Sequence, residues 1–103
     1  MKNKIYTAKS LYKKLGKFLR VENVPSRNGC GSAPNQFVLT YEHGEVFQSY
    51  RTVVGICVDG KYYFGTYHTC SNTTSSHVKR WCGYTAKERR EGIASGEFGF
   101  FKN

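Results

Sequence analysis

The chain has 103 residues, of which 39% are hydrophobic and 16% aromatic. This length suits one domain, over residues 1–103, and the aromatic content is high enough to exclude wholesale disorder. No apolar run approaches the ~20 residues that cross a bilayer, and no signal peptide is evident. We therefore expect a soluble protein of the reducing cytosol, with free thiols at its four cysteines.

The positive charge is concentrated at the two ends of the chain. Sixteen Lys and Arg residues against seven Asp and Glu residues give a net charge of +9. Residues 1–20 hold seven basic side chains and no acidic one, and residues 79–103 hold six basic against three acidic ones. Clustered cations are typical of proteins that bind polyanions, because neutralising phosphates releases condensed counterions. A merely solubilising surface explains the same composition and stays open as an alternative.

Residues 1–21 are expected to form a basic helical segment. Between residues 7 and 19 the leucines recur at the spacing of one apolar helix stripe, with Thr7 or Ser10 as the cap and Gly16 as a weak point or an end. A second stripe on the same helix is basic and comprises Lys9, Lys13 and Lys17. Residues 22–35 are rich in Pro, Gly, Asn and Ser, and this composition predicts a loop.

Residues 36–67 change to a β pattern. Their β-branched and aromatic residues predict three strands, over residues 37–41, 46–58 and 61–67. Asp59-Gly60 is a strong signal for a type I′ hairpin turn, and His43-Gly44 is a weaker one. The sequence therefore predicts a three-stranded antiparallel meander.

The two turns sort the side chains of this sheet onto two faces. The face that contains Ile56 is the better core, and the helices are expected to pack there. The other face is more polar, yet it places Phe47, Tyr62 and Phe64 beside Arg51. Aromatic side chains next to a cation on an open sheet can stack on bases. Cover by loops or by a second subunit is the alternative.

Residues 71–96 predict two short helices. A residue between Ser71 and Thr73 caps the first, Gly83 ends it, and a capping box formed by Thr85 and Glu88 starts the second. The phenylalanine-rich tail that follows is expected to dock as an extra strand or plug. The fold class is therefore α+β, with an N-terminal helix, a three-stranded meander and two short C-terminal helices packed on one face.

The start of the first C-terminal helix is a candidate phosphate site. It carries hydroxyls and a histidine, namely Ser71, Thr73, Thr74, Ser75 and His77. Backbone N–H groups at a helix start attract anions, and hydroxyls can donate to phosphate oxygens. The alternative is that one hydroxyl caps the helix and the others are incidental. Two hydroxyls would suffice for capping, so the excess favours a functional role.

Metal binding and catalysis are weakly supported. His68, Cys70, His77 and Cys82 are ligand-type side chains within fifteen residues, but they lack the close Cys spacing of structural zinc sites. A nucleophile at Cys70 or Ser71 beside His77 has no orienting carboxylate nearby in the sequence. No metal, cofactor or catalytic residue is therefore predicted, and a small nuclease that uses His68 or His77 remains a minority alternative.

Several of these residues resemble a family of small bacteriophage proteins. The resemblance covers about residues 35–98, and its most specific part is the motif Ser-x-Thr-Thr-Ser-x-His at residues 71–77. It also includes Ser49-Tyr50, Gly83, Lys87-Glu88 and Ser95-Gly96-Glu97-Phe98. That family has no agreed activity, so the resemblance implies a context: a phage product in the cytoplasm of a bacterial host, where such proteins often serve in host takeover or defence evasion.

We therefore expect a non-enzymatic phage accessory protein that binds RNA or DNA. The residues expected to contact nucleic acid are Lys9, Lys13, Lys17, Arg20, Arg51, Tyr62, Phe64, Lys79, Arg80, Arg89 and Arg90. The first alternative is a counter-defence protein, for example an anti-CRISPR, that binds a host protein or ribonucleoprotein complex. No membrane partner is expected, and a homodimer is possible.

Overall fold

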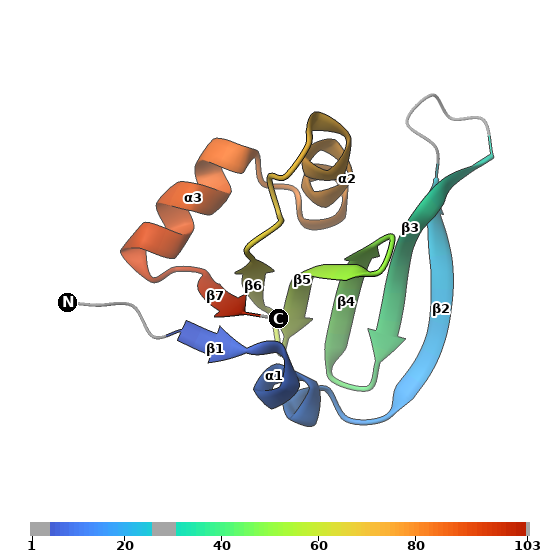
Figure 1. Ribbon diagram of the computed structural model, residues 1–103. Helices are drawn as coiled ribbons and strands as arrows, with labels where there is room; N and C mark the ends of the chain where they lie inside the picture. The colour runs from blue at the N-terminus through green and yellow to red at the C-terminus, as the bar shows by residue number, and fades with distance from the viewer. Residues whose placement is uncertain (1–4, 26–30, 103) are drawn as a thin grey trace.

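A computed structural model describes residues 5–25 and 31–102, and it shows a seven-stranded mixed sheet with three helices (Figure 1). In chain order the elements are β1 (Ile5–Thr7), α1 (Ala8–Leu15), β2 (Phe18–Pro25), β3 (Ser32–Tyr41), β4 (Gly44–Ser49), β5 (Thr52–Val58), β6 (Lys61–Gly65), α2 (Asn72–Cys82), α3 (Ala86–Ser95) and β7 (Gly99–Lys102). Across the sheet the strands run in the order β1-β7-β6-β5-β4-β3-β2. β7 is parallel to both β1 and β6, and all other neighbours are antiparallel.

The α+β class is as predicted, but the predicted architecture of three strands is wrong. One cause is a hairpin turn that divides the predicted strand 46–58 into β4 and β5. Ser49 pairs with Thr52, so Tyr50 and Arg51 form a two-residue loop. Tyr50 adopts a left-handed backbone with φ of 56°. Neither residue of this loop is the Gly or Asn that normally marks such a turn, so the sequence gives no signal for it.

The N-terminal third also differs from the prediction. Thr7 caps α1 by accepting a hydrogen bond from the Ser10 backbone N–H at 3.1 Å, and the helix ends at Gly16 (φ 79°). It is therefore shorter than predicted, and the chain continues directly into β2. Most of the predicted loop at 22–35 belongs to β2 and β3, while residues 26–30 lie outside the described part of the chain. Pro25 and Pro34 are tolerated in these strands because the β2–β3 pairing is irregular beyond Asn23, where a register shift interrupts it.

The helices cover both faces of the sheet, which corrects the prediction that all of them pack on one face (Figure 1). On the α1 face, Leu11 and Leu15 are fully buried against the central strands. Their partners there are Val46, Ile56, Val58, Tyr63 and Phe101. On the opposite side, the α2–α3 face, Val78 of α2 packs in a second core with Phe47, Val54, Phe64 and Phe98. The face that was expected to be open is therefore a second core.

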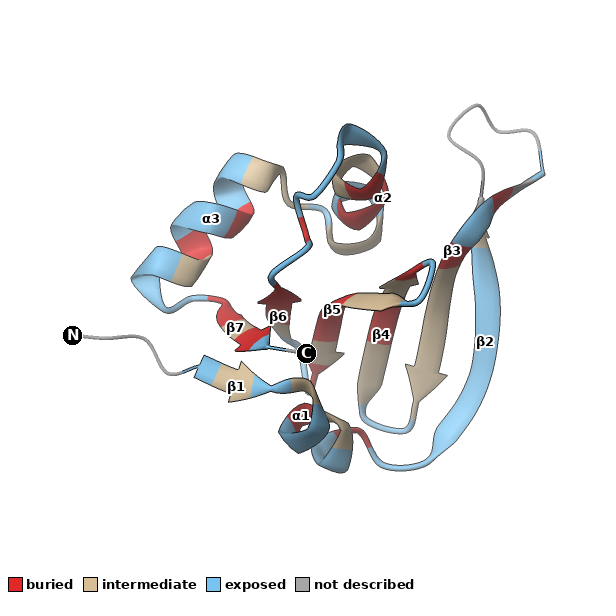
Figure 2. Cartoon of the chain, viewed as in Figure 1, coloured by how far each residue is buried: buried red, intermediate tan, exposed pale blue. Residues whose placement is uncertain are grey.

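The C-terminal tail forms a strand, as the phenylalanines suggested. β7 lies between β1 and β6, with Ile5 opposite Phe100 and Phe64 opposite Phe100 on the other side. Phe101 is buried in the α1 core, and Phe98, just before the strand, is buried in the other core. Burial is greatest in the central strands, whereas β2 at the far edge is largely exposed (Figure 2).

Candidate nucleic-acid interface around α2

The hydroxyls of the motif fasten the start of α2 to the sheet. Ser71 caps the helix by accepting a hydrogen bond from the Thr74 backbone N–H at 3.1 Å. The Thr74 hydroxyl also lies 3.1 Å from the Ser71 hydroxyl and 3.4 Å from that of Ser49 on β4. Thr74 and Ser49 are both buried, whereas Thr73 is exposed. Part of the motif thus links α2 to β4.

Ser75 of the motif belongs to a buried network around Arg89. The Arg89 side chain is 0% exposed, and its Nη2 donates to the Ser75 hydroxyl at 2.8 Å. Its Nε donates to His68 Nδ1 at 2.9 Å, and Nη1 donates to the Tyr84 carbonyl at 2.7 Å. The guanidinium also lies 5.8 Å from the centre of the Phe64 ring. Arg89 therefore connects three segments from the inside, and it is not the surface phosphate contact that its sequence position suggested.

His68 is held as a neutral imidazole in the same network. Burial, reinforced by the positive charges of Arg89 and Arg90, lowers the pKa of His68 to about 4. Because Nδ1 accepts the Arg89 hydrogen bond, it carries no proton. The second Arg89 bond, from Nη2 to the His68 carbonyl at 3.2 Å, fixes the backbone of this loop. The Nδ1 lone pair that a nuclease base would use is thus already occupied.

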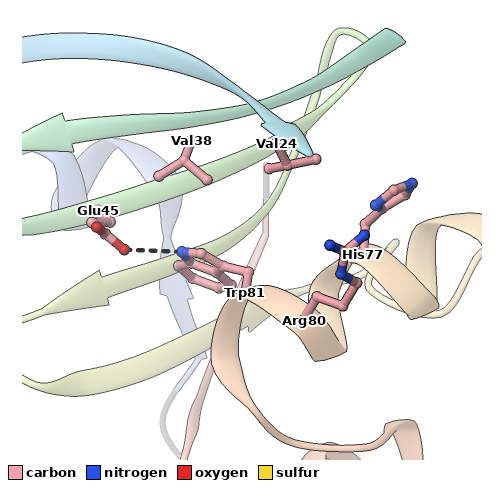
Figure 3. A pocket seen from close by; sticks show the side chains of 6 residues that line it. All are labelled: Val24, Val38, Glu45, His77, Arg80 and Trp81. Carbon is pink, nitrogen blue, oxygen red and sulfur yellow. Dashed lines mark hydrogen bonds between the residues drawn. The ribbon is translucent and has the colours of Figure 1, made fainter. Parts of the chain in front are cut away.

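A hollow of about 380 Å³ lies between α2 and the strands β2 to β4 (Figure 3). We call it the Trp81 hollow, and its lining residues are Val24, Val38, Glu45, His77, Arg80 and Trp81. The Trp81 indole donates to Glu45 Oε1 at 3.1 Å and stacks on Phe47 with ring centres 5.8 Å apart. His77, the last residue of the motif, is buried at this hollow, while Arg80 is exposed beside it. An aromatic side chain, a guanidinium and an apolar wall thus meet along α2.

A second hollow, of about 290 Å³, lies at the start of α2. We call it the tyrosine hollow, and it is lined by Ser49, Tyr50, Thr52, Val54, Tyr67, Cys70, Ser71 and Thr74. Tyr50 and Tyr67 are exposed, whereas most of the hydroxyls are at least partly buried. The motif residues Ser49-Tyr50 and Ser71-x-x-Thr74, which are separated by more than twenty positions in the sequence, come together here.

The predicted cations do not form one surface. Lys9 and Lys13 are exposed on α1, with Lys17 just beyond it, on the α1 side of the sheet. The exposed residues Lys79, Arg80 and Arg90 lie on α2 and α3, across the sheet. Arg20 on the β2 edge forms an ion pair with Glu22 at 2.9 Å, and Arg51 is exposed in the β4–β5 turn.

The predicted base-stacking group is not an open surface. Phe64 is 0% exposed beneath α2 and α3, so it cannot stack on a base. Tyr62 is half-buried, parallel to Phe64 with ring centres 6.1 Å apart and edge-on to Trp81 at 5.3 Å. Sequence reasoning missed Trp81, Glu45 and Tyr67 as site residues. No local signal could find them, because the two hollows form only when α2 is placed against β2 to β5.

The candidate metal ligands are dispersed. Within the described ranges, no group of three His, Cys, Asp or Glu side chains is placed to hold a metal ion. Cys57, Cys70 and Cys82 are free thiols, and Cys30 lies outside the described residues. Burial raises the pKa of the Cys57 and Cys82 thiols, which makes both poorer nucleophiles at neutral pH.

The sheet order, the two cores and the hollows along α2 define an α+β protein with a mixed seven-stranded sheet in its described residues. The chain belongs to a family of unknown function, DUF8033, whose model matches residues 3–96. No curated protein matches the chain, and no solved structure matches it either. None of the helices in the described residues is long and apolar enough to cross a membrane.

Proposed function

We propose that this protein binds nucleic acid through its exposed cations and performs no chemistry on it. The observation that supports this most is the large excess of positive charge on the surface. Seven acidic side chains cannot neutralise sixteen basic ones, and among the described Lys and Arg residues Arg89 alone is buried. The ion pair of Arg20 with Glu22 joins two side chains that are each more than half exposed, so it contributes little. Such a surface attracts a polyanion.

The interface is best placed along α2. Lys79 and Arg80 are exposed in the last turn of α2, and Arg90 is exposed on α3. The partly exposed indole of Trp81 lies in the adjacent hollow. Single-stranded nucleic acids are commonly held by cations and aromatic rings that lie together in this way. The lysines of α1 lie across the sheet, and there they strengthen the long-range attraction without contacting the same segment of the ligand.

A titration with two matched variants tests this placement. Fluorescence anisotropy with short single- and double-stranded RNA and DNA is expected to show binding that weakens with salt. The variant Lys79→Gln, Arg80→Gln, Arg90→Gln should lose most of its affinity. The matched variant Lys9→Gln, Lys13→Gln, Lys17→Gln removes the same charge and should retain more. Absence of binding to all four ligands by folded protein would overturn the proposed function.

The cellular setting forms part of the proposal. The resemblance of the motif at residues 71–77 to small bacteriophage proteins supports a phage accessory protein in the cytoplasm of a bacterial host. There it would act on nucleic acid during host takeover or defence evasion. Because the chain is basic, guide RNA, DNA or an acidic protein surface is the expected contact within a host defence complex.

The exposed edge of the sheet favours a second candidate function, in which the protein inhibits a host protein or ribonucleoprotein by direct binding. β2 is an edge strand, and its residues Phe18, Leu19 and Val21 are 47%, 52% and 53% exposed. The backbone N–H and C=O groups of an edge strand can pair with a strand from a partner, and exposed apolar side chains add contact area. A pull-down from nuclease-treated host lysate tests this candidate. A partner that survives nuclease and is lost with Val21→Lys would support it, and loss of every partner on nuclease treatment would exclude it.

A further inference from the structure

We infer that the tyrosine hollow holds one unpaired base of a single-stranded nucleic acid, and that the protein therefore prefers single strands to duplexes. The inference rests on the proposed nucleic-acid binding and specifies the form of the ligand.

Tyr50 is held outward by a turn that disfavours it. The residue is 62% exposed, and its backbone lies in the left-handed region at φ 56°, which Gly or Asn adopts with less strain. The Tyr50 backbone N–H donates to the Asn35 carbonyl at 2.6 Å, and Gln48 Nε2 donates to the Tyr50 carbonyl at 2.8 Å. Strained residues that their surroundings hold in place cluster at functional sites. The turn thus keeps an aromatic ring in solvent against its own backbone preference.

The second tyrosine of the hollow, Tyr67, is positioned by the buried Arg89 network. The residue is 50% exposed and lies in the segment between β6 and α2. The next residue, His68, is fastened to Arg89 through both its imidazole and its carbonyl. The Tyr67 carbonyl accepts a hydrogen bond from the Cys70 backbone N–H at 3.2 Å, which closes the turn. Both tyrosines therefore line the hollow from anchored backbone.

The floor of the hollow suits the edge of a base. Its lining includes the hydroxyl-bearing residues Ser49, Thr52, Ser71 and Thr74, with Val54 as an apolar member. Ser49, Ser71 and Thr74 already bond to one another or to the α2 backbone, but a hydroxyl oxygen has two lone pairs as well as one proton, so acceptor positions remain for the edge of a base. The volume of about 290 Å³ is roughly ten times the ~30 Å³ share of one water in the liquid, which leaves room for a planar heterocycle.

An unpaired base fits this arrangement better than a base pair does. In a duplex both faces of a base are stacked and its edge is paired, whereas an unpaired base can offer a face to an aromatic ring and its edge to the protein. Stacking on aromatic side chains tolerates any base, because every base has a π-face. Arg51 completes the turn beside Tyr50 and is exposed, so a cation is available for the phosphate of the same nucleotide.

The test uses the full chain and a single-stranded oligonucleotide with one 2-aminopurine. Binding should quench the 2-aminopurine fluorescence, since this base analogue dims when it stacks. Tyr50→Asn keeps a residue that tolerates the left-handed turn, and Tyr67→Ser removes the second ring. Each change is expected to weaken single-strand binding about 5- to 150-fold and to leave duplex binding unchanged. Tyr50→Phe and Tyr67→Phe, which keep the rings, should bind within about twofold of the wild type, because stacking needs only the ring.

Two results separate failure of this inference from failure of the proposed function. If Tyr50→Asn and Tyr67→Ser fold and bind single strands with unchanged, salt-dependent affinity, the hollow is not the base site, although nucleic-acid binding stands. If the wild-type complex forms without any quenching at any 2-aminopurine position along the oligonucleotide, the inference is likewise overturned, whatever the stability of the variants. Absence of binding to every nucleic acid would instead overturn the proposed function itself.

Discussion

Arg89 links three segments in the C-terminal half of the molecule through hydrogen bonds. Its guanidinium is fully buried, and the acceptors described for it are neutral: an imidazole nitrogen, a hydroxyl and two carbonyls. A buried cation is costly unless its donors are satisfied, and here the planar fork reaches three separate segments. The geometry therefore requires arginine and not merely a positive charge.

Replacement by lysine tests this requirement. Arg89→Lys keeps the charge but cannot supply the fork, so acceptors on His68, Ser75 and Tyr84 lose their donors. We expect the free energy of unfolding to fall by about 3 kcal/mol or more, measured by urea denaturation. The adjacent Arg90 is exposed, and Arg90→Lys should change stability by less than about 0.5 kcal/mol. Equal effects of the two variants would contradict the role assigned to Arg89.

His68 should make stability depend on pH. Its pKa is lowered to about 4 in the folded state, from 6.5, by burial and by nearby arginines. Between these values the unfolded chain binds more protons, so stability falls as the pH falls from about 6.5 towards 4. The expected loss between pH 7 and pH 5 is about 2 kcal/mol. His68→Gln should flatten this part of the profile in urea titrations, while the control His43→Gln, at an exposed turn position, should not.

At the scale of elements, the docking of α2 depends on a close approach at Gly55. A Cβ at this position would lie 2.4 Å from Cζ3 of Trp81, closer than any normal contact. Gly55→Ala should therefore push α2 away from β5 and cost about 1–3 kcal/mol in the free energy of unfolding. Because Trp81 is the one tryptophan of the chain, its fluorescence reports this displacement directly.

A double-mutant cycle provides the control for that prediction. Trp81→Leu removes the ring that the new methyl group would meet, so Gly55→Ala should cost much less in this background. The same penalty with and without the indole would show that the loss comes from the strand and not from the contact with α2.

Elements with local signals could be predicted from the sequence. The turn at Asp59-Gly60 and the capping box of Thr85 and Glu88 are present as expected, because a few adjacent residues determine each of them. The Tyr50-Arg51 turn, β2 and the insertion of β7 between β1 and β6 depend on contacts with distant segments. No pattern within a short window encodes such pairings, and the predicted meander was wrong for that reason.

In the candidate site, too, the residues with a local sequence signal could be predicted, and those placed by long-range packing could not. Ser71 and Thr74 were found because hydroxyls at a helix start have a recognisable pattern. The burial of Arg89 and Phe64 and the exposure of Tyr67 depend on how α2 and α3 pack on the sheet. Arginine is usually a surface residue, and no carboxylate partner is described for Arg89. Its burial therefore could not be predicted before the packing was known.

At the scale of the whole molecule, the charge predicts how binding responds to salt. Each phosphate neutralised on a single strand contributes a slope of about −0.7 to log K against log salt. If α2 and α3 together contact three phosphates, raising the salt from about 50 to 200 mM should weaken binding about twentyfold. Anisotropy titrations at several salt concentrations measure this slope. A peptide nucleic acid of the same sequence, which lacks phosphates, should bind far more weakly, and equal affinity for it would contradict the electrostatic basis of the proposal.

The position of β7 also determines when the molecule can finish folding. Among the described strands β1 pairs with β7 alone, so residues 5–7 have no strand partner until residues 99–102 have been synthesised and have left the ribosome. The antiparallel strands β2 to β6 can assemble earlier, because their partners are close in sequence. During translation Phe64, whose neighbour across the sheet is Phe100, would therefore face an open edge. A nascent chain that is stalled before β7 has left the ribosome should bind chaperones, whereas the released protein should not.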